Sequence, residues 1–219
     1  MSSEKYQIKE KAQYLNLLLL KDDLTYLHEL LDCPTKSTED WLNKLRNTRL
    51  VFLILDNVRE AAQKINLNGS VVYVEQTRQI RKDLLFANHF RNKAIGHLDH
   101  TLLERAVQWT PILFSEDHKD DLEFQTIEGH RNVIEASINS FLDDEGIQKV
   151  FKTEIDLMYP PDHDLFYQYL WKIVTDSIDW ASNALDILSS KIKFHNSDES
   201  SEISSIAGQT SRKGDRIIY

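Results

Sequence analysis

The chain has 219 residues, 41% of them hydrophobic and 28% charged, which supports a folded core and excludes wholesale disorder. Its one cysteine, Cys33, excludes an intrachain disulfide and is typical of a protein from a reducing compartment. Acidic residues outnumber basic ones by 35 to 26, a formal net charge of -9, so no overall positive field attracts nucleic acid. Any nucleic-acid partner must therefore be bound by a local surface.

The N-terminal segment, residues 1–11, is charged and lacks the apolar stretch of a secretory signal. The longest obvious apolar run, residues 17–20, is far shorter than the roughly 20 residues that cross a bilayer. Only six glycines and four prolines are present, too few for the tight turns of a sandwich or barrel. We therefore expect an all-α cytoplasmic protein without a membrane segment.

Hydrophobic residues that recur every three or four positions predict a first helix over residues 3–32, with a candidate break near Asp22 and Asp23. Ser37 or Thr38, followed by two acids, is typical of the N-terminus of a second helix, which continues to Ile65. A third helix is predicted over residues 73–95, with Gly96 as its C-terminal stop.

A capping-box spacing that begins at Thr101 predicts a fourth helix from residue 102 to a point before Pro111. An acidic loop follows, and then a fifth helix over residues 126–142 and a short one over residues 147–158. The last long helix is predicted over residues 164–193. Residues 195–219 are rich in Ser and acids and poor in apolar residues, which is typical of disorder. We therefore predict one antiparallel bundle of about six helices in residues 1–194 and a flexible C-terminal tail over residues 195–219.

The third predicted helix carries a local positive charge. Between residues 78 and 93 it has five basic residues and one acid, Asp83, within a chain of net charge -9. This segment is the best candidate for a surface that faces phosphates, although a solvated helix face offset by acids of neighbouring helices is the alternative. The candidate RNA-binding residues are Arg78, Arg81, Lys82, His89 and Lys93.

Arg91 lies within the apolar side of this helix, where a charged group needs a partner. Asp56 interrupts an apolar run of the second helix and is a candidate for that partner; a purely structural pair is an equal alternative. The predicted apolar side consists of Ile80, Leu84, Ala87, Phe90 and Ala94, and the predicted exposed side of Arg78, Arg81, Lys82, His89 and Asn92.

His97 follows Arg91 by six positions, and the Gly96 stop allows it to turn back toward the arginine. A guanidinium stabilises charge on a phosphate oxygen, and an imidazole moves a proton near neutral pH. RNA supplies its own nucleophile, the 2′-hydroxyl. An arginine and a histidine at one helix corner are therefore suited to RNA cleavage without a metal or other cofactor.

Residues 91–97, Arg-Asn-Lys-Ala-Ile-Gly-His, resemble the signature of the HEPN superfamily, an arginine and a histidine separated by four to six residues of which the first is polar. The resemblance implies an all-α bundle and a homodimer in which two arginine–histidine pairs face one cleft. It also implies a metal-independent endoribonuclease of the toxin–antitoxin or abortive-infection type. In that case Arg91 stabilises the phosphate, His97 is the general acid or base, Asn92 orients a neighbour, and the product ends in a cyclic phosphate.

One position departs from a HEPN subclass that is silenced by adenylylation, because Asp99 stands where that subclass has a tyrosine. We therefore do not expect control through that residue, although an antitoxin or another protein stays a candidate partner beside RNA. DNA is not expected as a partner, and the cluster of His97, Asp99 and His100 is not expected to hold a metal. The alternative function is a non-catalytic helical module that binds a protein or RNA.

Overall fold

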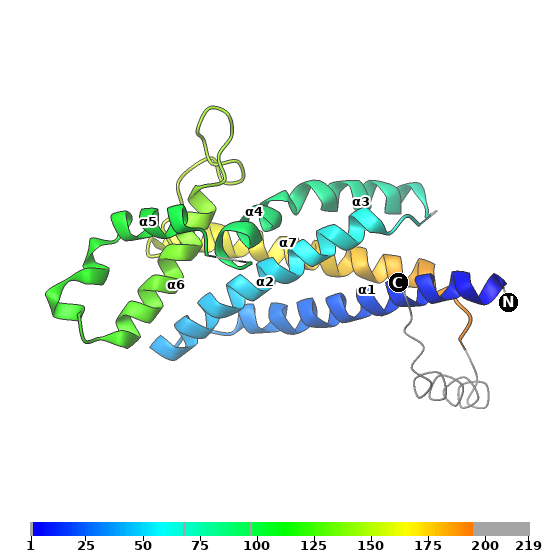
Figure 1. Ribbon diagram of the computed structural model, residues 1–219, viewed down its shortest axis with the longest axis horizontal. Helices are drawn as coiled ribbons and strands as arrows, with labels where there is room; N and C mark the ends of the chain where they lie inside the picture. The colour runs from blue at the N-terminus through cyan, green and yellow to red at the C-terminus, as the bar shows by residue number, and fades with distance from the viewer. Residues whose placement is uncertain (1, 68, 97, 195–219) are drawn as a thin grey trace, which may run out of the picture.

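The computed structural model describes residues 2–67, 69–96 and 98–194, with side chains from residue 8 onward. The fold is all-α, as predicted, and its core is a helical bundle (Figure 1). The predicted tail, residues 195–219, lies outside the described residues. The described helices are α1 (Ser2–Asp32), α2 (Thr38–Lys64), α3 (Val71–Asp83), α4 (Leu85–Ala94), α5 (His100–Trp109), α6 (Leu122–Asn139) and α7 (Pro160–Ser189), with 3₁₀ turns η1 (Pro111–Phe114) and η2 (Glu116–His118).

The long helices α1, α2 and α7 run along the length of the molecule, and α3 and α4 lie against α2 and α7 (Figure 1). The short turn between α1 and α2 makes these two helices antiparallel. At one end, α5 and α6 form a projecting pair joined through η1 and η2. The core is aromatic where α2 meets α4: the rings of Phe52 and Phe90 stack at 4.0 Å, and Phe86 meets Phe52 edge-on at 5.3 Å.

Short polar side chains set the starts of several helices. Ser37 accepts a hydrogen bond from the backbone N–H of Asp40, which confirms the predicted N-cap of α2. α5 begins at His100, two residues before the predicted start, because Asp99 caps it by accepting from the N–H of Leu102. The candidate break of α1 is absent, since Leu20 and Leu24 continue the buried stripe on both sides of the exposed Asp22 and Asp23.

The predicted helix over residues 73–95 is wrong as one continuous element, because it divides at Leu84 into α3 and α4. Leu84 has φ -84° and ψ 6° and is fully buried. Its N–H still reaches the carbonyl of Ile80 at 3.0 Å, so the chain changes direction without an unpaired backbone group at this position. The change allows α3 to pack on α7 while α4 packs on α2 and α6.

The predicted short helix over residues 147–158 is wrong, and that segment is irregular. Leu142 and Gln148 form an isolated antiparallel bridge, and the Gln148 side chain accepts from the N–H of Val150 at 2.6 Å. Gly146 has a φ of 78°, a turn conformation that side-chain-bearing residues rarely adopt. Side-chain and turn hydrogen bonds thus replace a helical ladder here.

Two further helix starts were predicted too late. α7 begins at Pro160 instead of residue 164, because proline fits the first helical turn, where its missing N–H has no partner to lose. α6 begins at Leu122, where Asp121 caps the helix by accepting from the N–H of Phe124 at 2.9 Å. In the part of the chain that the structure describes, every helix is too short or too polar to cross a bilayer.

Candidate functional site

Asp56 forms the centre of the candidate site, and its side chain has no exposed surface. The carboxylate oxygen Oδ1 accepts hydrogen bonds from Nε of Arg59 at 2.7 Å and from Nδ2 of Asn88 at 3.2 Å. Arg59 lies one turn further along α2, and Asn88 comes from α4. Burial of an unpaired carboxylate destabilises a folded protein. The contacts of Asp56 with Arg59 and Asn88 therefore allow its charge to be buried here.

Arg91 is the third partner of Asp56, which confirms the predicted internal contact. Its Nε lies 3.7 Å from Asp56 Oδ2, an ion pair longer than a hydrogen bond, and both atoms are buried without another hydrogen-bond partner. Yet 40% of the Arg91 side chain is exposed, against 12% for Arg59. Arg91 thus faces the buried carboxylate with its inner nitrogen, while part of its side chain is open to solvent.

The chain turns back over Arg91 immediately after α4. The Arg91 carbonyl accepts from the N–H groups of Ile95 at 3.2 Å and Gly96 at 2.8 Å. A Cβ at Gly96 would lie 3.9 Å from Arg91 Nε, so the backbone at residue 96 adjoins the arginine side chain. The Oδ1 of Asn92 accepts a long 3.4 Å contact from Arg91 Nη1. His97 lies outside the described residues, so the structure brings together Arg91 and Asn92 of the three predicted catalytic residues.

A second contact joins the end of α4 to the start of α5. Lys93 Nζ lies 2.7 Å from the carboxylate of Asp99, which also caps α5 through the N–H of Leu102 at 3.0 Å. The Lys93 hydrogen bond, followed by the backbone hydrogen bond, lowers the pKa of Asp99. The last turn of α4 and the first turn of α5 are therefore held together.

Arg49 and His130 are neighbours of the site that the sequence did not reveal as such. Arg49 Nη2 donates to the carbonyl of Ala94 at 2.6 Å, at the C-terminus of α4, and its Nη1 lies 3.4 Å from His130 Nδ1 on α6. Burial, and then the charge of Arg49, lower the pKa of His130 and favour its neutral form. The available signal was spacing, because Arg49 precedes Asp56 by two helical turns on the same face of α2.

The predicted RNA-binding residues are not one uniform surface. Arg78, Arg81 and Lys82 are exposed, but Arg78 pairs with Glu75 at 3.0 Å. Arg81 donates from Nε to the carbonyl of Ala62 at 2.8 Å and so caps the C-terminus of α2. Together with the Lys93–Asp99 pair, these contacts show that part of the predicted basic set has structural partners.

His89 differs from the prediction, because it is half-buried instead of exposed. Its Nε2 lies 2.9 Å from the hydroxyl of Ser140, and its ring packs 5.0 Å from that of Phe141. Burial, and then the charge of Lys93, lower the pKa of His89. The end of α6 covers this part of α4. The pattern of one helix in the sequence cannot predict such a contact with another helix. The predicted apolar side is confirmed, since Ile80, Leu84, Ala87, Phe90 and Ala94 are all buried.

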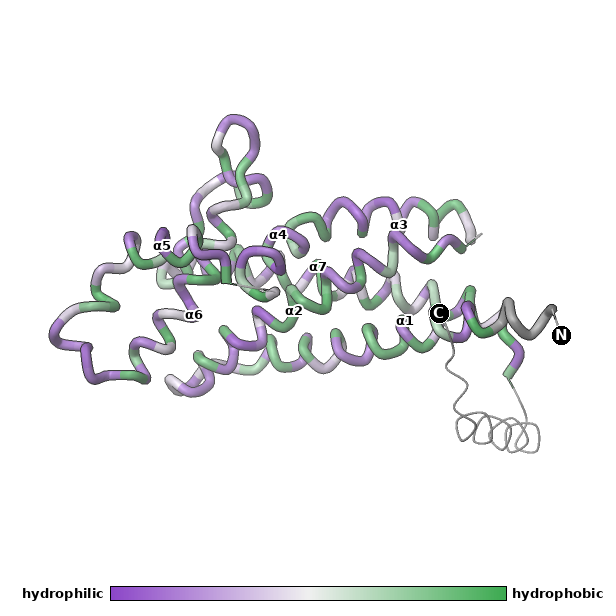
Figure 2. The backbone as a smooth tube through the Cα atoms, viewed as in Figure 1, coloured by the Kyte–Doolittle hydropathy of each residue, from purple (hydrophilic) through white to green (hydrophobic). Residues whose placement is uncertain are grey.

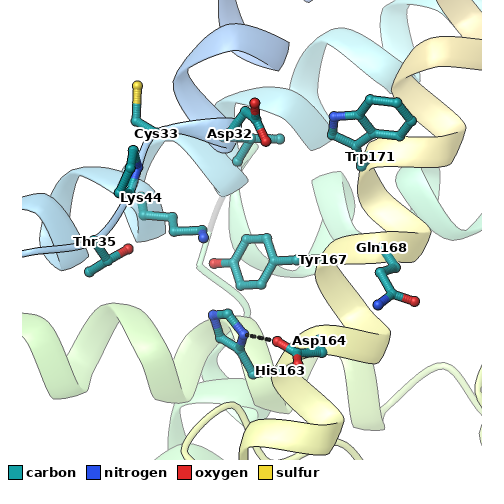
Figure 3. Close-up of a pocket in the computed structure, with 11 residues that line it drawn as sticks. Asp32, Cys33, Thr35, Lys44, His163, Asp164, Tyr167, Gln168 and Trp171 are labelled. Atoms are coloured by element: carbon teal, nitrogen blue, oxygen red, sulfur yellow. Dashed lines mark hydrogen bonds and ion pairs between the residues drawn. The ribbon is translucent and has the colours of Figure 1, made fainter.

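A separate pocket of about 470 Å³ lies between the α1–α2 turn and the start of α7 (Figure 3). In it, Lys44 Nζ lies 4.4 Å from the centre of the Tyr167 ring, and His163 lies 3.1 Å from Asp164. Burial lowers the pKa of Lys44 and raises the pKa of Tyr167 to about 12. The pocket shares no lining residue with the Arg91 site and holds Asp32 and Asp164 near its one lysine. Because the lining carries both positive and negative side chains, the charge of the pocket does not indicate one class of ligand.

Comparison of the chain with protein families, with curated proteins and with solved structures gives no match.

Proposed function

We propose that this protein is a HEPN-like, metal-independent endoribonuclease whose site is built on Arg91 and His97. The observation that carries the proposal is the position of the Arg91 side chain. Its Nε faces the buried carboxylate of Asp56, while 40% of the side chain is open to solvent. An arginine in this position has its N–H donors oriented before a phosphate binds. Less conformational entropy is then lost when the phosphate binds.

In the proposed reaction, the 2′-hydroxyl of RNA attacks the adjacent phosphorus and the bond to the 5′-oxygen breaks. The products are a 2′,3′-cyclic phosphate and a 5′-hydroxyl. Arg91 stabilises the charge that builds on the non-bridging oxygens, while His97 moves a proton at the attacking or leaving oxygen. Asn92 orients the Arg91 guanidinium through its side-chain oxygen.

The proposal extends to the biological setting implied by the HEPN resemblance. It places the protein in the cytoplasm as a homodimer, in a toxin or phage-defence system. RNA is the substrate, and the exposed Arg78 and Lys82 of α3 attract its phosphates. An antitoxin would act as a further protein partner.

The test is incubation of the purified protein with total RNA in EDTA, followed by analysis of the fragment ends. Wild type is expected to produce cyclic phosphate ends, and His97→Ala and Arg91→Lys are expected to abolish them. His100→Ala is the matched control, because His100 is close in sequence but is 88% exposed and pairs with Glu104. Equal cleavage by wild type and His97→Ala would overturn the assignment.

A non-catalytic interaction module is the second candidate, and an exposed apolar group on the projecting α5–α6 pair favours it. Trp109, Ile112, Phe114 and Leu122 are 51–73% exposed there. Absence of RNA cleavage by wild type, together with RNA or protein binding that survives His97→Ala, would support this alternative.

A further inference from the structure

Helix α1 carries a second apolar face that no other described part of the chain covers. Its inner face is the buried stripe of Leu17, Leu20, Leu24, Leu27 and Leu31, which packs on α2 and α7. On the outer face, Ile8 is 68%, Leu15 54%, Leu19 56% and Tyr26 62% exposed. Figure 2 shows hydrophobic residues that recur along the coloured part of α1.

The outer face has the spacing of a coiled-coil seam. Steps of four and three residues lead from Ile8 through Ala12, Leu15, Leu19 and Asp22 to Tyr26. Five of these six positions are apolar, and all six are exposed. Over 19 residues the seam is about 28 Å long, enough for five helical turns of contact with another helix.

We propose that the outer face of α1 binds the α1 of a second copy of this chain in an antiparallel arrangement. The seam supports self-association because it presents the same positions on both copies, as a two-fold axis requires. Centring the axis at residue 17 uses the full seam: Leu15 faces Leu19 of the second copy, Ala12 faces its Asp22, and Ile8 faces its Tyr26.

Charge selects the antiparallel direction. The exposed Asp22 lies in the C-terminal half of the seam and the exposed Asp23 lies beside it, whereas the exposed Lys9 and the half-buried Lys11 lie beside the N-terminal half. An antiparallel pair places each acidic half beside the basic half of the other copy. A parallel pair would place the two Asp22 carboxylates opposite each other within the seam, where like charges are destabilising.

The α1 proposal is independent of the endoribonuclease proposal, because it uses no residue of the Arg91 site. The α1 dimer differs from the homodimer that the HEPN resemblance implies, in which two arginine–histidine pairs face one cleft. Its interface lies on α1, which packs on α2 and α7 and contributes no residue to the Arg91 site. No folding cost opposes it, since α1 is already held in the bundle through its inner face.

The first experiment measures the mass of the full chain by light scattering across a dilution series. Wild type is expected to approach twice the 25.6 kDa chain mass at high concentration. The double variant Leu15→Glu and Leu19→Glu is expected to stay monomeric with an unchanged helical circular-dichroism spectrum. The matched control is Val71→Glu with Val72→Glu, at positions that are 86% and 76% exposed on α3, and it is expected to dimerise like wild type.

The second experiment tests the direction by disulfide formation in a Cys33→Ser background. A mixture of the Leu15→Cys and Leu19→Cys chains is expected to form a mixed disulfide, whereas either chain alone is expected to form none. A disulfide between two Leu15→Cys chains would overturn the antiparallel arrangement. A wild-type chain that stays monomeric throughout, or a dimer that survives the Leu15→Glu and Leu19→Glu changes, would overturn the α1 interface.

Discussion

Replacing Asp56 with Ala is expected to destabilise the fold more than replacing Arg91 with Ala. Asp56 has no exposed surface, and its removal leaves the 12%-exposed Arg59 side chain without its 2.7 Å partner. Loss of one partner from a buried ion pair costs about 3–5 kcal/mol. For a chain of this size, a loss of 3 kcal/mol corresponds to a fall in Tm of about 6–12 °C.

Arg91→Ala is expected to cost about 1 kcal/mol or less, because the pair is 3.7 Å long and the arginine is 40% exposed. Asp56 also keeps its contacts to Arg59 and Asn88 in that variant. The assay is urea unfolding of both variants, with Asp186→Ala as an exposed-carboxylate control that is expected to change stability by about 0.5 kcal/mol or less. An Asp56→Ala cost of under about 1 kcal/mol would refute the reasoning. A cost for Arg91→Ala equal to that of Asp56→Ala would show that Arg91 is a structural residue.

The remaining predictions concern pH and helix capping. Burial lowers the pKa of His130 and His89 from the ordinary 6.5, so the unfolded chain binds protons that the folded chain does not. The free energy of unfolding is therefore expected to fall as the pH drops below the pKa of histidine in the unfolded chain. In urea unfolding between pH 5.5 and 7.5, His130→Gln should reduce this dependence of the unfolding free energy on pH. An unchanged pH dependence would contradict the burial argument. Asp99 has a lowered pKa, so its contribution to stability is present above the unfolded pKa and is lost as the pH falls through the folded one; Asp99→Asn should reduce that acid-dependent loss. Ser37→Ala removes the cap at the start of α2 and is expected to cost about 1 kcal/mol, whereas Ser37→Asp should retain most of the stability. Equal unfolding midpoints for these two Ser37 variants would argue against a capping role.

The repeat of apolar residues in the sequence determined the all-α class and the buried side of the segment that contains Arg91. A helix places residues three and four apart on one face whatever it packs against, so Ile80, Ala87 and Phe90 could be assigned to the core in advance. An arginine on that face needs a partner, and an acid inside the apolar run of α2 was therefore a candidate for it.

Only the tertiary structure decided the break at Leu84, the burial of His89 and the contact of Arg49 with Ala94 and His130. Each of these depends on segments distant in sequence that meet in space. Leu84 separates a helix that packs on α7 from one that packs on α2 and α6, and the end of α6 covers His89. These contacts form only when the helices pack together. A sequence pattern indicates the preferences of one helix at a time and does not contain the contacts between helices.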